Sequence, residues 1–126
     1  MLKTYPAIFH QEEDNAYWVE FPNFQGGTQG DDLEEAMLMA KEFLAGSIAY
    51  FLEEDIALPT PVDITKLAAT DGFATLIQAD PAPYIKGNKT VRKNITIPEW
   101  LVKKADKEHI NYSKTLTQAL IGKLKL

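Results

Sequence analysis

Alternating apolar and polar side chains predict four strands in the first 80 residues. Residues 2–10 and 16–21 change from apolar to polar at every second position, the period of a strand that is buried on one face. The acidic stretch between them, residues 11–15, predicts a hairpin turn. A short stretch rich in glycine, residues 25–30, predicts a third strand, and the alternation at residues 73–79 predicts a fourth. Pro6 further predicts that the first strand lies at an edge or is bulged there.

Between the third and fourth strands, residues 31–53 have the 3.6-residue period of a long helix. Asp31 with Glu34, or Asp32 with Glu35, has the spacing of a capping box at its start. One stripe of the helix is expected to cover the sheet, and it comprises Leu33, Ala36, Met37, Ala40, Leu44, Ile48 and Phe51. The flanks carry more apolar surface than one small sheet needs. This excess indicates either a partner surface or, as is commoner, a deeply seated helix.

The pattern of the last third of the chain, residues 91–126, predicts one strand and two helices. Ile95 and Ile97 alternate with polar neighbours, which indicates a half-buried strand. Pro98 ends that strand and suits the first turn of a helix, where its missing N–H leaves no bond unmade. Helices are expected at residues 99–108 and 114–124. Ser113 is expected to cap the second, and Asn111 to end the first in a left-handed turn.

A strand and two short helices cannot form a core alone, because the strand has no ladder partner and the buried area is too small. A second copy solves both problems by pairing the two strands antiparallel across a two-fold axis. The shared core of this dimer would contain Ile95, Ile97, Leu101, Ala105, Leu116 and Leu120. The polar strand faces would then display Arg92, Asn94 and Thr96 twice, on a two-stranded ribbon that fits the major groove of DNA.

This segment resembles the ribbon-helix-helix family of bacterial DNA-binding domains. The resemblance implies that Arg92, Asn94 and Thr96 read base edges. It also implies that the turn before the second helix, with Ser113 and Lys114, anchors a phosphate of the DNA backbone.

Net charge divides the chain in the same way as the pattern does. Residues 1–85 hold three basic and fifteen acidic side chains, a net charge of −12. Residues 86–126 hold ten basic and three acidic side chains, a net charge of +7. A basic end suits a polyanion and an acidic body suits a basic partner, although a solubility surface with a lysine-rich tail would give the same counts.

A second resemblance covers nearly the whole chain, from residue 2 to about residue 124. The sequence FPNFQGGTQGD at residues 21–31, followed by LEEA at residues 33–36, is similar to the N-terminal signature of the HicB antitoxin family. The resemblance implies a partial ribonuclease-H-like domain of β-β-β-α-β order that binds and blocks HicA, a small basic toxin that cleaves messenger RNA. It further implies a C-terminal domain that dimerises and binds the operator of the toxin–antitoxin genes.

Nothing in the sequence indicates an active site. Two-metal cleavage of a phosphodiester needs several acids within ~4 Å of paired metals, and the acids here fall in turns, caps and single strand positions. His10 and His109 have no cysteine or second patterned base near them in sequence. We therefore expect no catalytic residue, no metal and no cofactor.

These observations predict an α+β protein with three regions. Residues 1–80 would bind the toxin, residues 81–90 would be a linker, and residues 91–126 would be the ribbon-helix-helix unit. With no cysteine and no apolar run of ~20 residues, the sequence fits a cytoplasmic protein without a membrane segment. The predicted function is an antitoxin that neutralises a HicA-like toxin and represses its own operon. The alternative is a dimeric repressor whose N-terminal domain senses a small ligand.

Overall fold

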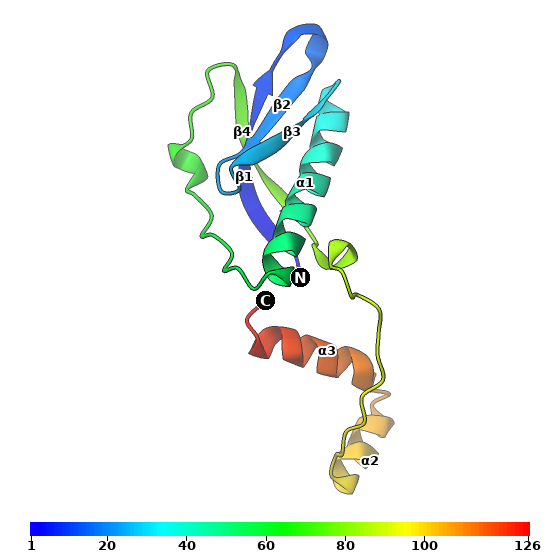
Figure 1. Ribbon diagram of the computed structural model, residues 1–126. Coiled ribbons are helices and arrows are strands. Elements are labelled where there is room, and N and C mark those ends of the chain that lie inside the picture. Colours follow the sequence, from blue (N-terminus) through cyan, green and yellow to red (C-terminus); the bar gives the residue numbers. More distant parts are fainter. The chain divides into compact units, whose positions relative to one another are not determined.

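The computed structural model describes residues 1–126 and divides them into two compact units, Met1–Asn88 and Lys89–Leu126 (Figure 1). The strands of the first unit are β1 (Lys3–Gln11), β2 (Tyr17–Phe21), β3 (Gly26–Gly30) and β4 (Gly72–Ala79). Helix α1 (Leu33–Glu53) follows β3, so the predicted β-β-β-α-β order is confirmed. Three single 3₁₀ turns complete the unit: η1 (Glu13–Asn15), η2 (Ile64–Lys66) and η3 (Ala82–Tyr84).

The four strands form one antiparallel sheet in the order β3-β2-β1-β4. This order places β1 inside the sheet, whereas Pro6 predicted an edge strand or a bulge at that position. The ladder with β2 covers only Ile8 to Gln11, so at Pro6 the strand has β4 as its one neighbour, with Leu76 opposite. Pro6 therefore occupies a local edge, where a missing N–H costs little.

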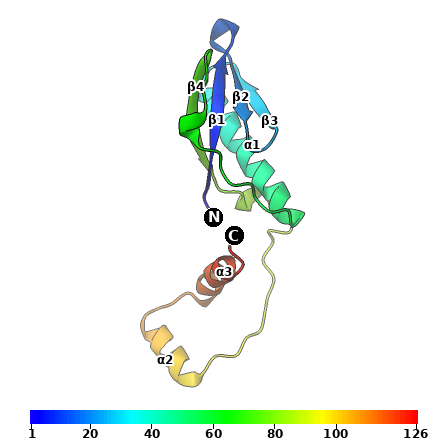
Figure 2. The same ribbon diagram turned by 90° about the vertical axis from the view of Figure 1, so that its left-hand side faces the viewer.

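The core lies between the sheet and α1, because every second side chain of the strands points to the helix. Tyr5, Ala7 and Phe9 of β1 are buried there, as the alternation predicted. They pack with buried side chains of the other elements, namely Val19, Phe21, Ala36, Ala40, Leu44, Ala45, Ile48, Ile77 and Ala79. Figure 2 shows the connection from α1 to β4 passing in front of β1, with α1 behind the sheet.

Helix α1 begins where the acidic pairs predicted. Asp32 is the N-cap, and its Oδ1 accepts a hydrogen bond from the Glu35 N–H at 2.8 Å. The buried stripe is rotated from the predicted one, because Leu33 and Met37 are 43% and 41% exposed while two alanines are buried in their place. Those alanines are Ala45 and Ala49. Small side chains let the helix lie close to the sheet, and Gly30 shows how close, since a Cβ there would come within 2.3 Å of the Ala36 nitrogen.

The second unit contains α2 (Glu99–Lys107) and α3 (Tyr112–Lys123). The strand predicted before α2 is not formed in the single chain, because residues 91–98 have no strand opposite them to bond. Two predicted caps are wrong. Asn111, rather than Ser113, caps α3 by accepting from the Lys114 N–H at 3.0 Å. His109, rather than Asn111, takes the left-handed conformation after α2, with φ of 54°.

No helix in the chain combines the length and the apolar character that crossing a membrane requires.

His10, at the end of β1, is held between two carboxylates. Its Nδ1 lies 2.8 Å from Asp71 Oδ1 and its Nε2 lies 3.5 Å from Glu20 Oε1. The hydrogen bond with Asp71 raises the pKa of His10 above its ordinary value, against a smaller lowering by burial. The same bond lowers the pKa of Asp71.

We therefore expect the first unit to be most stable in mildly acidic solution. A raised histidine pKa adds stability that is complete below pH ~6.5 and is lost as the pH rises through the folded-state value. The lowered pKa of Asp71 adds stability that is lost only as the pH falls below ~4. Urea unfolding at pH 5.5 and pH 8 should give the higher midpoint at pH 5.5. His10→Gln should reduce the difference between the two urea midpoints. An unchanged difference would show that His10 and its two carboxylates do not cause the pH dependence.

Candidate interaction surfaces

The second unit exposes the side chains from which a core would be built. No residue between Lys89 and Leu126 is buried. Ile95, Leu101, Leu116 and Leu120 are 52%, 42%, 37% and 52% exposed, although all are large and apolar. Helix α2, the segment before it and the start of α3 border an open groove of about 480 Å³, lined by Ile95, Thr96, Ile97, Val102 and Tyr112. Continuous exposed apolar surfaces are typical of interaction sites, so this face is a candidate interaction surface.

The residues predicted to contact DNA lie at two places in this unit. Arg92 and Asn94 are exposed in the extended segment before α2, whereas Thr96 lies beside Ile95 and Ile97 in the wall of the groove. Ser113 and Lys114 are in the first turn of α3. The Lys114 N–H already donates to Asn111, so the N–H groups of Tyr112 and Ser113 are the ones left for a ligand.

Tyr112 is a structural residue that the sequence pattern did not reveal. Its hydroxyl donates to Asp106 Oδ1 at 2.5 Å and lies 3.4 Å from the carbonyl oxygen of Val102. The bond to Asp106 raises the pKa of Tyr112, because ionisation would place two negative charges together. This contact ties the start of α3 to α2.

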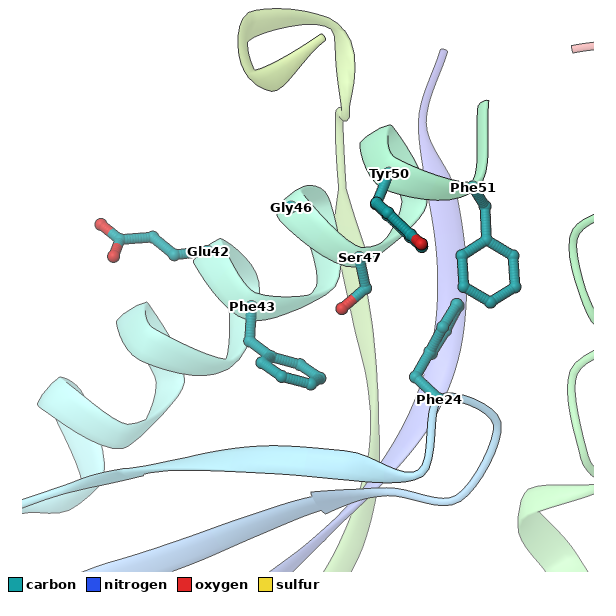
Figure 3. Close-up of a pocket in the computed structure, with 7 residues that line it drawn as sticks. All are labelled: Phe24, Glu42, Phe43, Gly46, Ser47, Tyr50 and Phe51. Carbon is teal, nitrogen blue, oxygen red and sulfur yellow. The ribbon is translucent and has the colours of Figure 1, made fainter. Parts of the chain in front are cut away.

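In the first unit, the C-terminal half of α1 borders an open groove of about 480 Å³. Figure 3 shows Phe43 on one side and Phe24 on the other, with the Ser47 hydroxyl directed into the space between them. Phe24 packs edge-on against Phe51 with ring centroids 5.4 Å apart, which braces this side. Phe43 stacks on Phe21 at 5.3 Å. The rest of the lining consists of Glu42, Gly46 and Tyr50.

The charges along α1 have no ion-pair partner inside the chain, although Glu35 and Glu53 each accept a hydrogen bond from a backbone N–H. The ion pairs of the protein join His10 to Glu20 and Asp71, and Lys103 to Glu99, so none involves α1. Its last turn has no basic residue, yet Glu53 ends the helix, Glu54 is its C-cap and Asp55 follows, so three acids lie next to the negative end of the helix dipole. This end of the unit therefore favours a cationic partner.

A smaller groove of about 270 Å³ lies on the other flank of α1, against β4. Met37 and Leu38 line it from the helix, and Leu76 lines it from the strand. All three are exposed, Leu38 by 57% and Leu76 by 53%. Of the apolar side chains on the flanks of α1, Leu38 and Tyr50 are exposed, whereas Ala45 and Ala49 are buried and seat the helix on the sheet.

The structure contains no group of three or more histidine, cysteine, aspartate or glutamate residues arranged to hold a metal ion. Glu20 and Asp71 face different nitrogens of His10, so the three side chains do not converge on one point.

Comparisons with known proteins agree on one family. The family model described as the HicB-like antitoxin of bacterial toxin–antitoxin systems matches residues 5–122. A 14.9 kDa protein from the rep–hol intergenic region of Haemophilus phage HP1 is 32% identical, with 95% of this chain and 96% of the phage protein covered. Antitoxin HicB 1 of Photorhabdus laumondii is 34% identical over 45% of this chain and 37% of its own length.

Solved structures are similar over almost the full length. A chain of a toxin–antitoxin complex from Streptococcus pneumoniae is 31% identical with a TM-score of 0.65, covering 98% of this chain and 99% of that one. The antitoxin HicB of Burkholderia pseudomallei has the same fold, with a TM-score of 0.56 at 20% identity and 97% and 96% of the two chains covered.

Proposed function

Because the chain belongs to the HicB-like antitoxin family of bacterial toxin–antitoxin systems, we propose that it neutralises a small basic HicA-like toxin and represses its own operon as a DNA-binding dimer. The first unit binds the toxin, and the second unit dimerises and binds the operator. The observation that carries this proposal is that the first unit is acidic and the second is basic. Each unit also leaves large apolar side chains exposed. Family membership favours it over a repressor that senses a small ligand.

Toxin binding by the first unit is supported by charge and by exposed apolar surface. Residues 1–85 carry a net charge of −12, and the acids of α1 have no ion-pair partner in the chain. Opposite charge steers association, while apolar contacts hold the complex. The similar chain from S. pneumoniae was solved as part of a toxin–antitoxin complex.

Dimerisation through the second unit is supported by its lack of a core. About 40 residues bury too little surface to fold without help. A second copy would cover Ile95 and Ile97 and give each extended segment a strand to bond with. The paired segments would then form the ribbon predicted from the sequence, with Arg92, Asn94 and Thr96 on its outer face.

The dimer is tested by Ile95→Asp, which should place a charge in the shared core and prevent the second unit from assembling. Light scattering should show a dimer or larger assembly for the parent chain at micromolar concentration and a monomer for the variant. Val62→Asp is the matched control, since Val62 is an exposed β-branched residue of the first unit, outside the expected dimer core. A folded monomer of the parent chain would contradict the proposed dimer.

Toxin neutralisation should depend on the first unit alone. Residues 1–88 should bind the basic toxin and suppress its RNA cleavage, and the Ile95→Asp chain should do the same. The association rate should fall as salt rises, because screening weakens the attraction between opposite charges. Cleavage that is stopped by the full chain but continues with residues 1–88 would contradict this division of labour.

DNA reading should separate into base contacts and backbone contacts. Arg92→Ala or Asn94→Ala should weaken operator binding by roughly 1–3 kcal/mol per contact and relax the base preference. Lys114→Ala should weaken binding to operator and random duplex alike and make the salt dependence shallower. Titrations of each variant on both duplexes at several salt concentrations would measure this. If Asn94→Ala weakened binding to both duplexes equally, the ribbon would not be the element that reads the base sequence.

A further inference from the structure

The most unusual residue of α1 is Gly46, in the interior of a 21-residue helix. Glycine disfavours a helix interior relative to alanine, because it loses more backbone freedom on folding. Elsewhere in this unit the fold requires a glycine, as at Gly30, where a Cβ would collide with α1. A Cβ at position 46 would meet nothing within 4 Å, and the backbone there is helical. Neither packing nor conformation within the chain calls for a glycine.

Gly46 lies in the aromatic groove described above. Phe43 precedes it by three residues and Tyr50 follows it by four, so the three share one face of the helix. Without a side chain at position 46, a partner's backbone can approach the helix axis between the aromatic side chains (Figure 3). Tyr50 is 55% exposed at one end of this opening.

Charge identifies the kind of partner. Glu42 lines the groove, and Glu54, the C-cap of α1, and Asp55 follow Tyr50 by four and five residues. These carboxylates have no cation opposite them in the chain, and the helix dipole adds negative potential at the same end. Aromatic faces beside carboxylates are also favourable surroundings for lysine and arginine side chains.

We propose that the groove over Gly46 is the place where the basic toxin docks, with a segment of its backbone against the glycine and its basic side chains beside Glu42, Glu54 and Asp55. This inference rests on the proposed toxin binding and adds its location and chemistry. The opposite flank of α1, at Leu38 and Leu76, lacks the glycine and carries Lys41 in place of acids, and so is not the docking groove. Gly46 thus lowers the stability of the free helix and favours the complex.

The test is Gly46→Ala, for which stability and binding should change in opposite directions. The added methyl should raise the melting temperature of the first unit by roughly 2–8 °C. Trp18 fluorescence reports this in a Trp100→Phe background, because these are the only two tryptophans. The same methyl should weaken binding of purified toxin to the full chain at least tenfold, measured by calorimetry together with loss of protection in an RNA-cleavage assay.

Three further variants make the result specific. Tyr50→Ala should also weaken toxin binding at least tenfold. Leu38→Ala, on the opposite flank of α1, should change it less than twofold. Gly122→Ala is the matched glycine control, because Gly122 lies in α3 with no atom within 4 Å of an added Cβ, and toxin binding should be unaffected.

Charge is tested by Glu54→Gln combined with Asp55→Asn, and asparagine tolerates the left-handed φ of 54° at position 55. This double variant should slow toxin association and reduce its dependence on salt. Unchanged toxin affinity for Gly46→Ala and Tyr50→Ala, with the parent chain binding normally, would overturn the groove while leaving the antitoxin function standing. A changed oligomeric state with unchanged toxin affinity would also overturn it, by assigning the groove to a second copy. Failure of the parent chain to bind toxin would instead contradict the proposed function.

Discussion

The constraint on which most of this protein depends is that its second unit cannot bury its own apolar side chains. Ile95, Leu101, Leu116 and Leu120 are all more than one-third exposed in the single chain. The same shortage leaves residues 91–98 without a ladder, because strand hydrogen bonds need a second strand. The lack of a packing partner therefore accounts for the absent core, the unformed strand and the groove beside α2. A two-stranded ribbon that reads DNA can form only once such a partner is present.

The first unit shows how far a sequence pattern determines a fold. The two-residue period placed Tyr5, Ala7 and Phe9 on the buried face, and local capping chemistry placed the start of α1 at Asp31 or Asp32, of which Asp32 is the N-cap. Both signals are local, so sequence alone contains them. The position of β1 inside the sheet is different, because it depends on β4, which follows some 60 residues later. The rotation of α1 likewise depends on how closely alanines seat the helix against Gly30.

The candidate sites were less visible from sequence, for a related reason. The groove combines Phe24 from the turn between β2 and β3 with residues on successive turns of α1, and only the folded unit brings them together. The bond from Tyr112 to Asp106 joins two helices, so no periodicity signals it. The charge division was readable, since counting side chains needs no geometry. Sequence thus indicated the kinds of partner, and the structure contains the groove at which we propose that one of them docks.

Because the two units of the chain carry opposite charges, charge alone cannot make either unit selective for one partner. An acidic unit attracts any basic surface, including the basic unit of another copy, and attraction beyond about 8 Å is screened at physiological salt. Selectivity must therefore come from close contacts that only the correct partner completes. The proposed docking groove would provide such contacts, because the missing side chain at Gly46 leaves room only for a backbone that fits between the aromatic side chains. For DNA, base-contacting side chains of the kind predicted at Arg92 and Asn94 would serve the same purpose, since phosphate attraction is equal on every sequence.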